Sequence, residues 1–126
     1  MKKEIEIQMK LSNKWISNKL SIKEAIQYCE LAILSYSKSD SFDDKASTRR
    51  YTYCKTMLDL ARINGGQLLG VNNNSKDYVT FTLSFDTDKG YSLFNKGFVA
   101  FTKSCGYVRP EDPNWFWFNF SKKRIH

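Results

Sequence analysis

Residues Tyr78–Phe85 have the sequence Tyr-Val-Thr-Phe-Thr-Leu-Ser-Phe. Of all segments of the chain, this one indicates its secondary structure most clearly. Apolar side chains occupy every second position from Val79 to Phe85, and hydroxyl side chains stand between them. A period of two residues is typical of a strand with one face on a core and one polar face. We therefore predict a strand over 78–85.

Two further segments support a sheet. Glu4–Leu11 alternates polar and apolar residues, which favours a half-buried strand over the competing interpretation, the first turn of a helix. Gln67–Val71 is a short strand candidate, and the asparagine-rich segment 72–75 after it has the composition of a turn.

A helix is predicted over 22–37. Ser21 and Glu24 form a capping box, in which a serine hydroxyl and a glutamate three residues later satisfy the first free amides of the helix. Apolar residues then recur at helical spacing.

A second helix follows a polar connection in which Phe42 is an expected anchor. Asp43 or Asp44 is suited to cap it, and Asn64-Gly65-Gly66 is suited to end it. The short connection favours two antiparallel, packed helices.

The chain beyond Gly66 is rich in β-branched and aromatic residues, so we expect strands there. A hairpin loop is predicted at Asp86–Gly90. The further predicted strands are Tyr91–Phe94, Phe98–Lys103 and Trp115–Phe120, with breaks at 95–97 and 106–114.

The expected fold class is therefore α+β. An N-terminal strand and an antiparallel helical hairpin pack on a C-terminal antiparallel β-sheet. The chain has 126 residues and a mass of 14.7 kDa, which suits a single domain spanning residues 1–126.

Composition narrows the function classes. The one histidine is the last residue, and neutral-pH general bases and zinc sites usually use histidine. We expect no enzyme, no metal and no cofactor, although an enzyme built on Asp, Glu, Tyr and Arg stays open. The three cysteines are widely spaced, which favours buried free thiols.

The chain contains no apolar run of membrane-spanning length and no signal-peptide segment near its first residue. We expect a cytoplasmic protein without a membrane partner. The net charge of +7 is spread along the chain, so a nucleic-acid partner is not favoured. Lys122-Lys123-Arg124 is expected to be a solvated tail, with nucleic-acid contact as the alternative.

Three features carry candidate chemistry. The run Trp115–Phe120 is either a strand covered on both faces, a self-association surface or a platform for stacked bases. Arg109 precedes a proline-stiffened acidic segment and either binds phosphate or pairs with its own loop. Arg50 lies on the apolar helix face, and it either pairs with Asp59 or Glu30 or points into a polar pocket.

The layout of the chain and the block Gly106–Trp115 resemble the first type of phage-encoded Thoeris anti-defence sponge proteins. The resemblance implies a homo-oligomer in the host bacterial cytoplasm. It also implies that the protein holds a cyclic ADP-ribose signal, made by TIR-domain proteins, without cleaving it. The host immune effector is then left without its activator.

Such a ligand carries a purine, two riboses and a diphosphate. The ligand contacts expected for these groups are Arg109 and Arg50 for the diphosphate, Phe81, Phe94 or Trp115 for the base, and Asn95 and Asp112 for the hydroxyls. The alternative function is a phage or mobile-element inhibitor that binds a host protein or nucleic acid, such as a guided nuclease.

Overall fold

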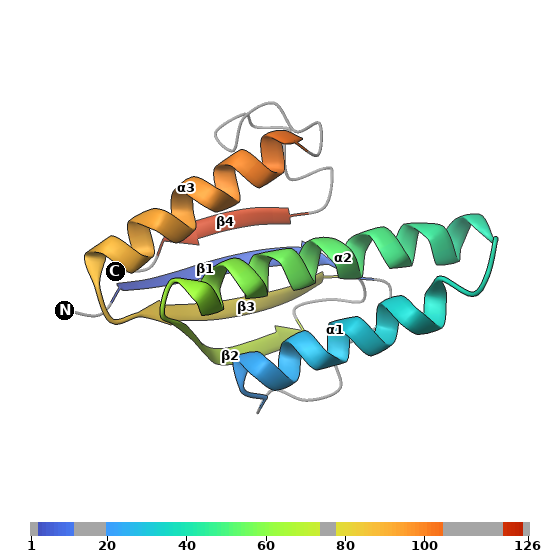
Figure 1. Cartoon of the computed structure of the whole chain (residues 1–126), viewed down its shortest axis with the longest axis horizontal. Coiled ribbons are helices and arrows are strands. Elements are labelled where there is room, and N and C mark those ends of the chain that lie inside the picture. The colour runs from blue at the N-terminus through green and yellow to red at the C-terminus, as the bar shows by residue number, and fades with distance from the viewer. Residues whose placement is uncertain (1–2, 12–19, 74–77, 105–119, 125–126) are drawn as a thin grey trace.

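The computed structural model describes residues 3–11, 20–73, 78–104 and 120–124. Figure 1 shows a sheet with helices across one face. In chain order the elements are β1 (Lys3–Lys10), α1 (Ile22–Tyr36), α2 (Phe42–Ile63), β2 (Gly66–Asn73), β3 (Tyr78–Phe85), α3 (Asp88–Ser104) and β4 (Phe120–Arg124).

The described strands form one antiparallel sheet in the order β2-β3-β1-β4. This order and connectivity are those of the split β-α-β motif of ferredoxin-like domains. The helical hairpin α1–α2 stands where that motif has its first helix (Figure 1). The predicted α+β fold class is confirmed.

The core lies between the sheet and its helices. β1 and β3 pair in a register that sets Ile7 opposite Phe81 and Ile5 opposite Leu83, and all four side chains are buried. Successive side chains of a strand point to opposite faces. The strand predicted at 78–85 from its period-two pattern therefore forms the central layer of the core. The segment Glu4–Leu11 is also a strand rather than the first turn of a helix, and this strand covers residues 3–10.

The hairpin begins and ends largely as predicted. The Ser21 hydroxyl accepts from the Glu24 amide at 3.2 Å, and the Glu24 carboxylate accepts from the Ser21 amide at 3.0 Å. Gly65, with φ of +78°, follows the last residues of α2 in the left-handed conformation that glycine adopts without strain.

The predicted cap of the second helix was wrong by two to three residues. The Ser41 hydroxyl accepts from the Asp44 amide at 3.1 Å, so Ser41 is the cap and Asp44 lies in the first turn. A helix that starts at Phe42 turns this ring outward, and Phe42 is 83% exposed. It is therefore not an anchor.

The largest correction concerns residues 86–104, which form a turn and helix α3 instead of a hairpin loop and two strands. The Thr87 hydroxyl accepts from the Gly90 amide at 3.0 Å, and the Thr87 carbonyl accepts from the Tyr91 amide at 3.1 Å. Phe94 and Phe98 then fall on one face of the helix, and both are buried. Their spacing is helical, although their residue type favours strands.

The predicted strand Trp115–Phe120 reaches the described residues only at Phe120. The basic segment predicted as a tail belongs to β4, which pairs with β1 so that Lys123 is the Cα partner of Glu6. The segment is therefore paired with β1 through its backbone rather than forming a tail.

Hydroxyl side chains line α2. Ser47, Thr48, Thr52 and Thr56 each donate to the carbonyl four residues earlier, at 2.8–3.0 Å. Such bonds compete with helix formation, and threonine has a low helix propensity. α2 is therefore helical because of what it packs against rather than because of its own sequence preference.

Tyr51 lies fully buried between α1 and α2. Its ring stacks on Tyr36 at 5.9 Å and meets the edge of Tyr28 at 6.1 Å. Cys54 and Cys29 are buried free thiols, as predicted for them. Burial, with Tyr28 and Tyr36 nearby, raises the pKa of Tyr51 far above its usual range, and burial beside Cys29 raises the pKa of Cys54.

We predict that stability falls at alkaline pH partly through Tyr51. The phenol stays protonated in the folded state but ionises in the unfolded chain above about pH 10, so its stabilisation is complete below that pH and is lost above it. The expected loss from this one group is about 1.4 kcal/mol per pH unit above pH 10. Urea unfolding of the wild type and Tyr51→Phe between neutral and alkaline pH measures it. Equal pH dependence in the two proteins would contradict the prediction.

Candidate functional site: a charged groove between two helices

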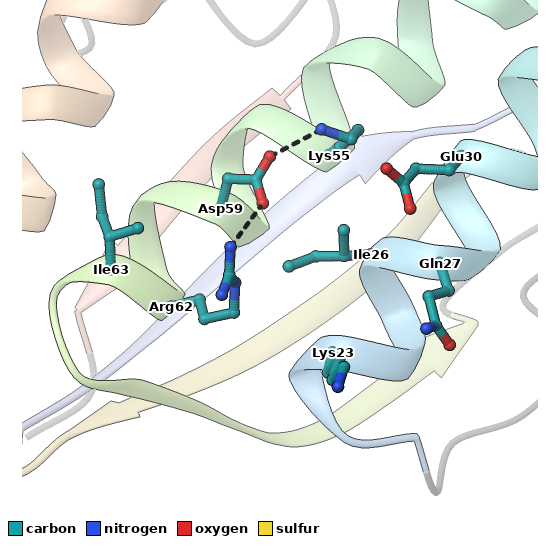
Figure 2. Close-up of a pocket in the computed structure, with 8 residues that line it drawn as sticks. All are labelled: Lys23, Ile26, Gln27, Glu30, Lys55, Asp59, Arg62 and Ile63. Atoms are coloured by element: carbon teal, nitrogen blue, oxygen red, sulfur yellow. Dashed lines mark hydrogen bonds and ion pairs between the residues drawn. The ribbon is translucent and has the colours of Figure 1, made fainter.

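A groove of about 420 Å³ lies between α1 and the C-terminal half of α2 (Figure 2). This volume is within the range of small-molecule sites. The residues that line the groove are Lys23, Ile26, Gln27, Glu30, Lys55, Asp59, Arg62 and Ile63.

Helical periodicity brings the polar lining together. On α1, Lys23, Gln27 and Glu30 are four and three residues apart, so they follow one stripe. On α2, Lys55 and Asp59 are spaced in the same way. The two helices pack antiparallel, and the Glu30 side chain of α1 points toward Lys55 of α2, whereas Gln27 points away from α2 (Figure 2).

Apolar side chains complete the lining. Ile26 is buried and belongs to the core, whereas Ile63 is exposed at the end of α2. In Figure 2 the two isoleucines lie on opposite sides of Arg62. The groove therefore offers hydrocarbon surface next to its charges.

Asp59 joins the two cations of α2. Its carboxylate lies 2.9 Å from Lys55 Nζ and 3.8 Å from Arg62 Nη2. The Asp59 carboxylate, helped by the charge of Glu30, raises the pKa of Lys55. The lysine therefore stays charged at neutral pH.

The lining carries an excess of positive charge. Three cations, Lys23, Lys55 and Arg62, share the lining with two carboxylates, Glu30 and Asp59 (Figure 2). Arginine and lysine bind phosphate and carboxylate oxygens, and carboxylates accept hydrogen bonds from hydroxyls. The groove is chemically suited to a ligand with an anionic group, hydroxyls and an apolar part.

The structure does not bring the predicted site residues together. On facing helices, Leu60 lies against Gly97 and the Tyr53 ring lies 5.6 Å from that of Phe101. Asn95 is two residues from Gly97, and Arg50 is ten residues from Leu60. Ten helical residues span about 15 Å, so half-buried Arg50 lies about that far along α2 from the contact between Leu60 and Gly97, near which Asn95 lies.

Phe81 and Phe94 are core residues. Both are 0% exposed, and the Phe94 ring contacts Phe85 at 5.0 Å and Phe98 at 5.8 Å between ring centres. Neither ring presents a face to a ligand, so the stacking role predicted for them is replaced by a packing role. Arg109, Asp112 and Trp115 lie outside the described residues.

Asp59 and Glu30, the two carboxylates considered as partners for Arg50, have other neighbours in the structure. Asp59 forms its ion pairs with Lys55 and Arg62, its neighbours on the same helix. Glu30 lies in the groove lining, where its charge acts on Lys55.

The polar stripe that builds the groove was not recognised in the sequence. The signal was the helical spacing of charges beside the apolar face of each helix, but solvated helices show the same pattern. What distinguishes these charges is the partner helix opposite them. Within the described ranges, no three His, Cys, Asp or Glu side chains gather as metal ligands, and no helix is long and apolar enough to cross a membrane.

Comparison with known proteins identifies no relative: no family model, curated protein or solved structure matches the chain.

Proposed function

We propose that the protein binds a nucleotide of the cyclic ADP-ribose type in the groove between α1 and α2. The observation that carries the proposal is the grouping of Lys23, Lys55 and Arg62 around apolar surface in a groove of about 420 Å³. Phosphates need cations, and a purine needs apolar surface. The groove supplies both within the reach of one small molecule.

The remaining lining fits the sugar part of such a ligand. Glu30 and Asp59 supply acceptors for ribose hydroxyls, and Gln27 supplies both a donor and an acceptor. Asp59 holds Lys55 and Arg62 in place before a ligand arrives, which lowers the ordering cost of binding.

The biological role that we propose is sequestration. The ligand is held intact and is released when the protein unfolds, so a host immune effector loses its activating signal. This role rests on the resemblance to phage-encoded Thoeris sponges, and the cations and apolar surface of the groove support it.

A second function is favoured by exposed apolar residues at the turn end of the hairpin. Leu31, Leu34 and Phe42 are exposed there, and Figure 1 shows this end extending past the ends of the strands. Clustered exposed apolar residues often mark protein contacts. The alternative is therefore an inhibitor that docks this end on a host protein.

We predict that cyclic ADP-ribose isomers raise the melting temperature of the wild type. A ligand present at 100 times its dissociation constant adds about 2.7 kcal/mol of stability. Incubation, removal of free ligand and heat release, followed by mass spectrometry, should return the intact nucleotide. No stabilisation by any isomer at high micromolar concentration would overturn the proposal.

A pair of matched variants tests the groove itself. Arg62→Ala removes a groove cation that is largely exposed, and we expect about tenfold weaker binding from the lost charged hydrogen bonds. Lys96→Ala removes an exposed cation of α3 outside the groove and should leave affinity unchanged. Equal effects of the two variants would show that the ligand binds elsewhere or only through net charge.

A further inference from the structure

Two of the three cysteines lie side by side in the core. Cys29 belongs to α1 and Cys54 belongs to α2, and both side chains are 0% exposed. The Cys54 thiol lies within hydrogen-bonding reach of the Cys29 thiol, and both thiols are free. Two thiols in such contact need only an oxidant to form a disulfide.

The tyrosine contacts of the hairpin fix the level at which these cysteines lie. The Tyr51 ring of α2 meets Tyr28 at 6.1 Å and Tyr36 at 5.9 Å between ring centres, so Tyr51 is level with the midpoint between them on α1. The helices are antiparallel, so three residues forward on α2 correspond to three residues back on α1 (Figure 1). That step leads from Tyr51 to Cys54 on α2 and from the midpoint to Cys29 on α1. The two cysteines therefore face each other.

The spacing of packed helices suits a bond between these residues. The axes of packed helices lie about 8–10 Å apart, and a Cα atom lies about 2.3 Å from its own axis. Cα atoms that face each other are therefore about 5 Å apart, within the range of about 4.4–6.8 Å that a disulfide spans.

The cysteine pair adjoins the groove. Glu30, which lines the groove, follows Cys29 in α1. Lys55, which also lines it, follows Cys54 in α2. A charge on Cys29 acts on Lys55, so this thiol lies near a groove cation. A bond between the two cysteines would join the two helices that form the groove and fix their separation.

We propose that Cys29 and Cys54 form an oxidation site, at which hydrogen peroxide converts the two thiols to a disulfide that clamps α1 to α2. One thiolate attacks a peroxide oxygen, the O–O bond breaks, and a sulfenic acid and hydroxide form. The other thiolate attacks the sulfenic sulfur, the S–O bond breaks, and the disulfide and a second hydroxide form. The two thiol protons convert both hydroxides to water.

The fold keeps this pair reduced until the hairpin opens locally. Both thiols are buried, and burial beside Cys29 raises the pKa of Cys54, so its nucleophilic thiolate is scarce at neutral pH. We therefore expect the oxidation to follow local opening of α1 and α2. The oxidation needs no ligand in the groove and is independent of the proposed function.

Treatment of the full, folded chain with hydrogen peroxide at neutral pH tests the proposal. Alkylation of the product after unfolding should count one free thiol instead of three. Peptide mapping should join the peptides that contain Cys29 and Cys54. The melting temperature of the oxidised protein should rise by about 10 °C, because the new loop restricts the unfolded chain. A small-molecule dithiol should reverse both changes.

Cys29→Ala and Cys54→Ala are the matched controls, since each removes one thiol, keeps the site apolar and reports any effect of methionine oxidation. Peroxide should give neither variant the rise in melting temperature. The peptide map of the wild type decides the proposal even if a variant fails to fold. Retention of all three thiols, a disulfide through Cys105, oxidation that stops at a sulfinic acid, or a Cys29–Cys54 bond without a rise in melting temperature would refute it.

Discussion

Replacing Phe94 with alanine is expected to lower the free energy of unfolding by about 3–5 kcal/mol. The Phe94 ring is fully buried and packs between Phe85 of the sheet and Phe98 of the same helix. Its removal leaves a cavity where α3 meets the sheet. Urea denaturation followed by circular dichroism measures the loss.

Leu93→Ala is the matched control because Leu93 is the neighbouring residue of α3 and is 46% exposed. We expect a change of about 0.5 kcal/mol or less. The two variants also test the core-packing role assigned to Phe94. If Phe94→Ala kept wild-type stability but lost nucleotide binding, the ring would be a ligand contact after all.

Replacing Gly90 with alanine is expected to destabilise the protein by about 3 kcal/mol. The new methyl group would collide with the backbone carbonyl oxygen of Asn64, the residue that caps α2. A backbone atom cannot move without displacing the end of α2. Alanine also gains up to about 1 kcal/mol of helix propensity over glycine, so the collision must outweigh that gain.

Gly97→Ala provides the control within the same helix. Its methyl group would lie 3.0 Å from Leu60 Cδ2, which is the far end of a flexible side chain. We expect a change within about 1 kcal/mol of wild type, because the helix propensity gained offsets the shift of Leu60. Thermal and urea unfolding of both variants compare them. Equal destabilisation by the two substitutions would show that α3 tolerates neither contact.

The parts of the fold that were predictable carry local signals. Alternation alone specified β3, and the Ser21–Glu24 capping box specified the start of α1. α3 was missed because its aromatic residues favour strands by type, while its spacing favours a helix. The local signal for the start of the helix was Thr87, whose hydroxyl accepts from the Gly90 amide in the first turn of α3. A threonine before an acidic residue also suits a hairpin loop, so the sequence pattern alone was ambiguous.

The candidate site was less predictable than the fold. Lys23 and Arg62 lie far apart in sequence and line the same groove only because α1 and α2 pack antiparallel. Phe81 and Phe94 were plausible ligand contacts by residue type, but residue type does not show on which side of a sheet the helices lie. That arrangement makes both rings part of the core.

The hydroxyl-lined helix α2 has a consequence for how the groove responds to a ligand. Since α2 depends on tertiary packing for its helicity, its half of the groove exists only while the whole domain is folded. Binding of the proposed nucleotide is therefore expected to be thermodynamically linked to global unfolding, and occupancy of the groove should slow hydrogen exchange throughout the domain rather than only at the groove.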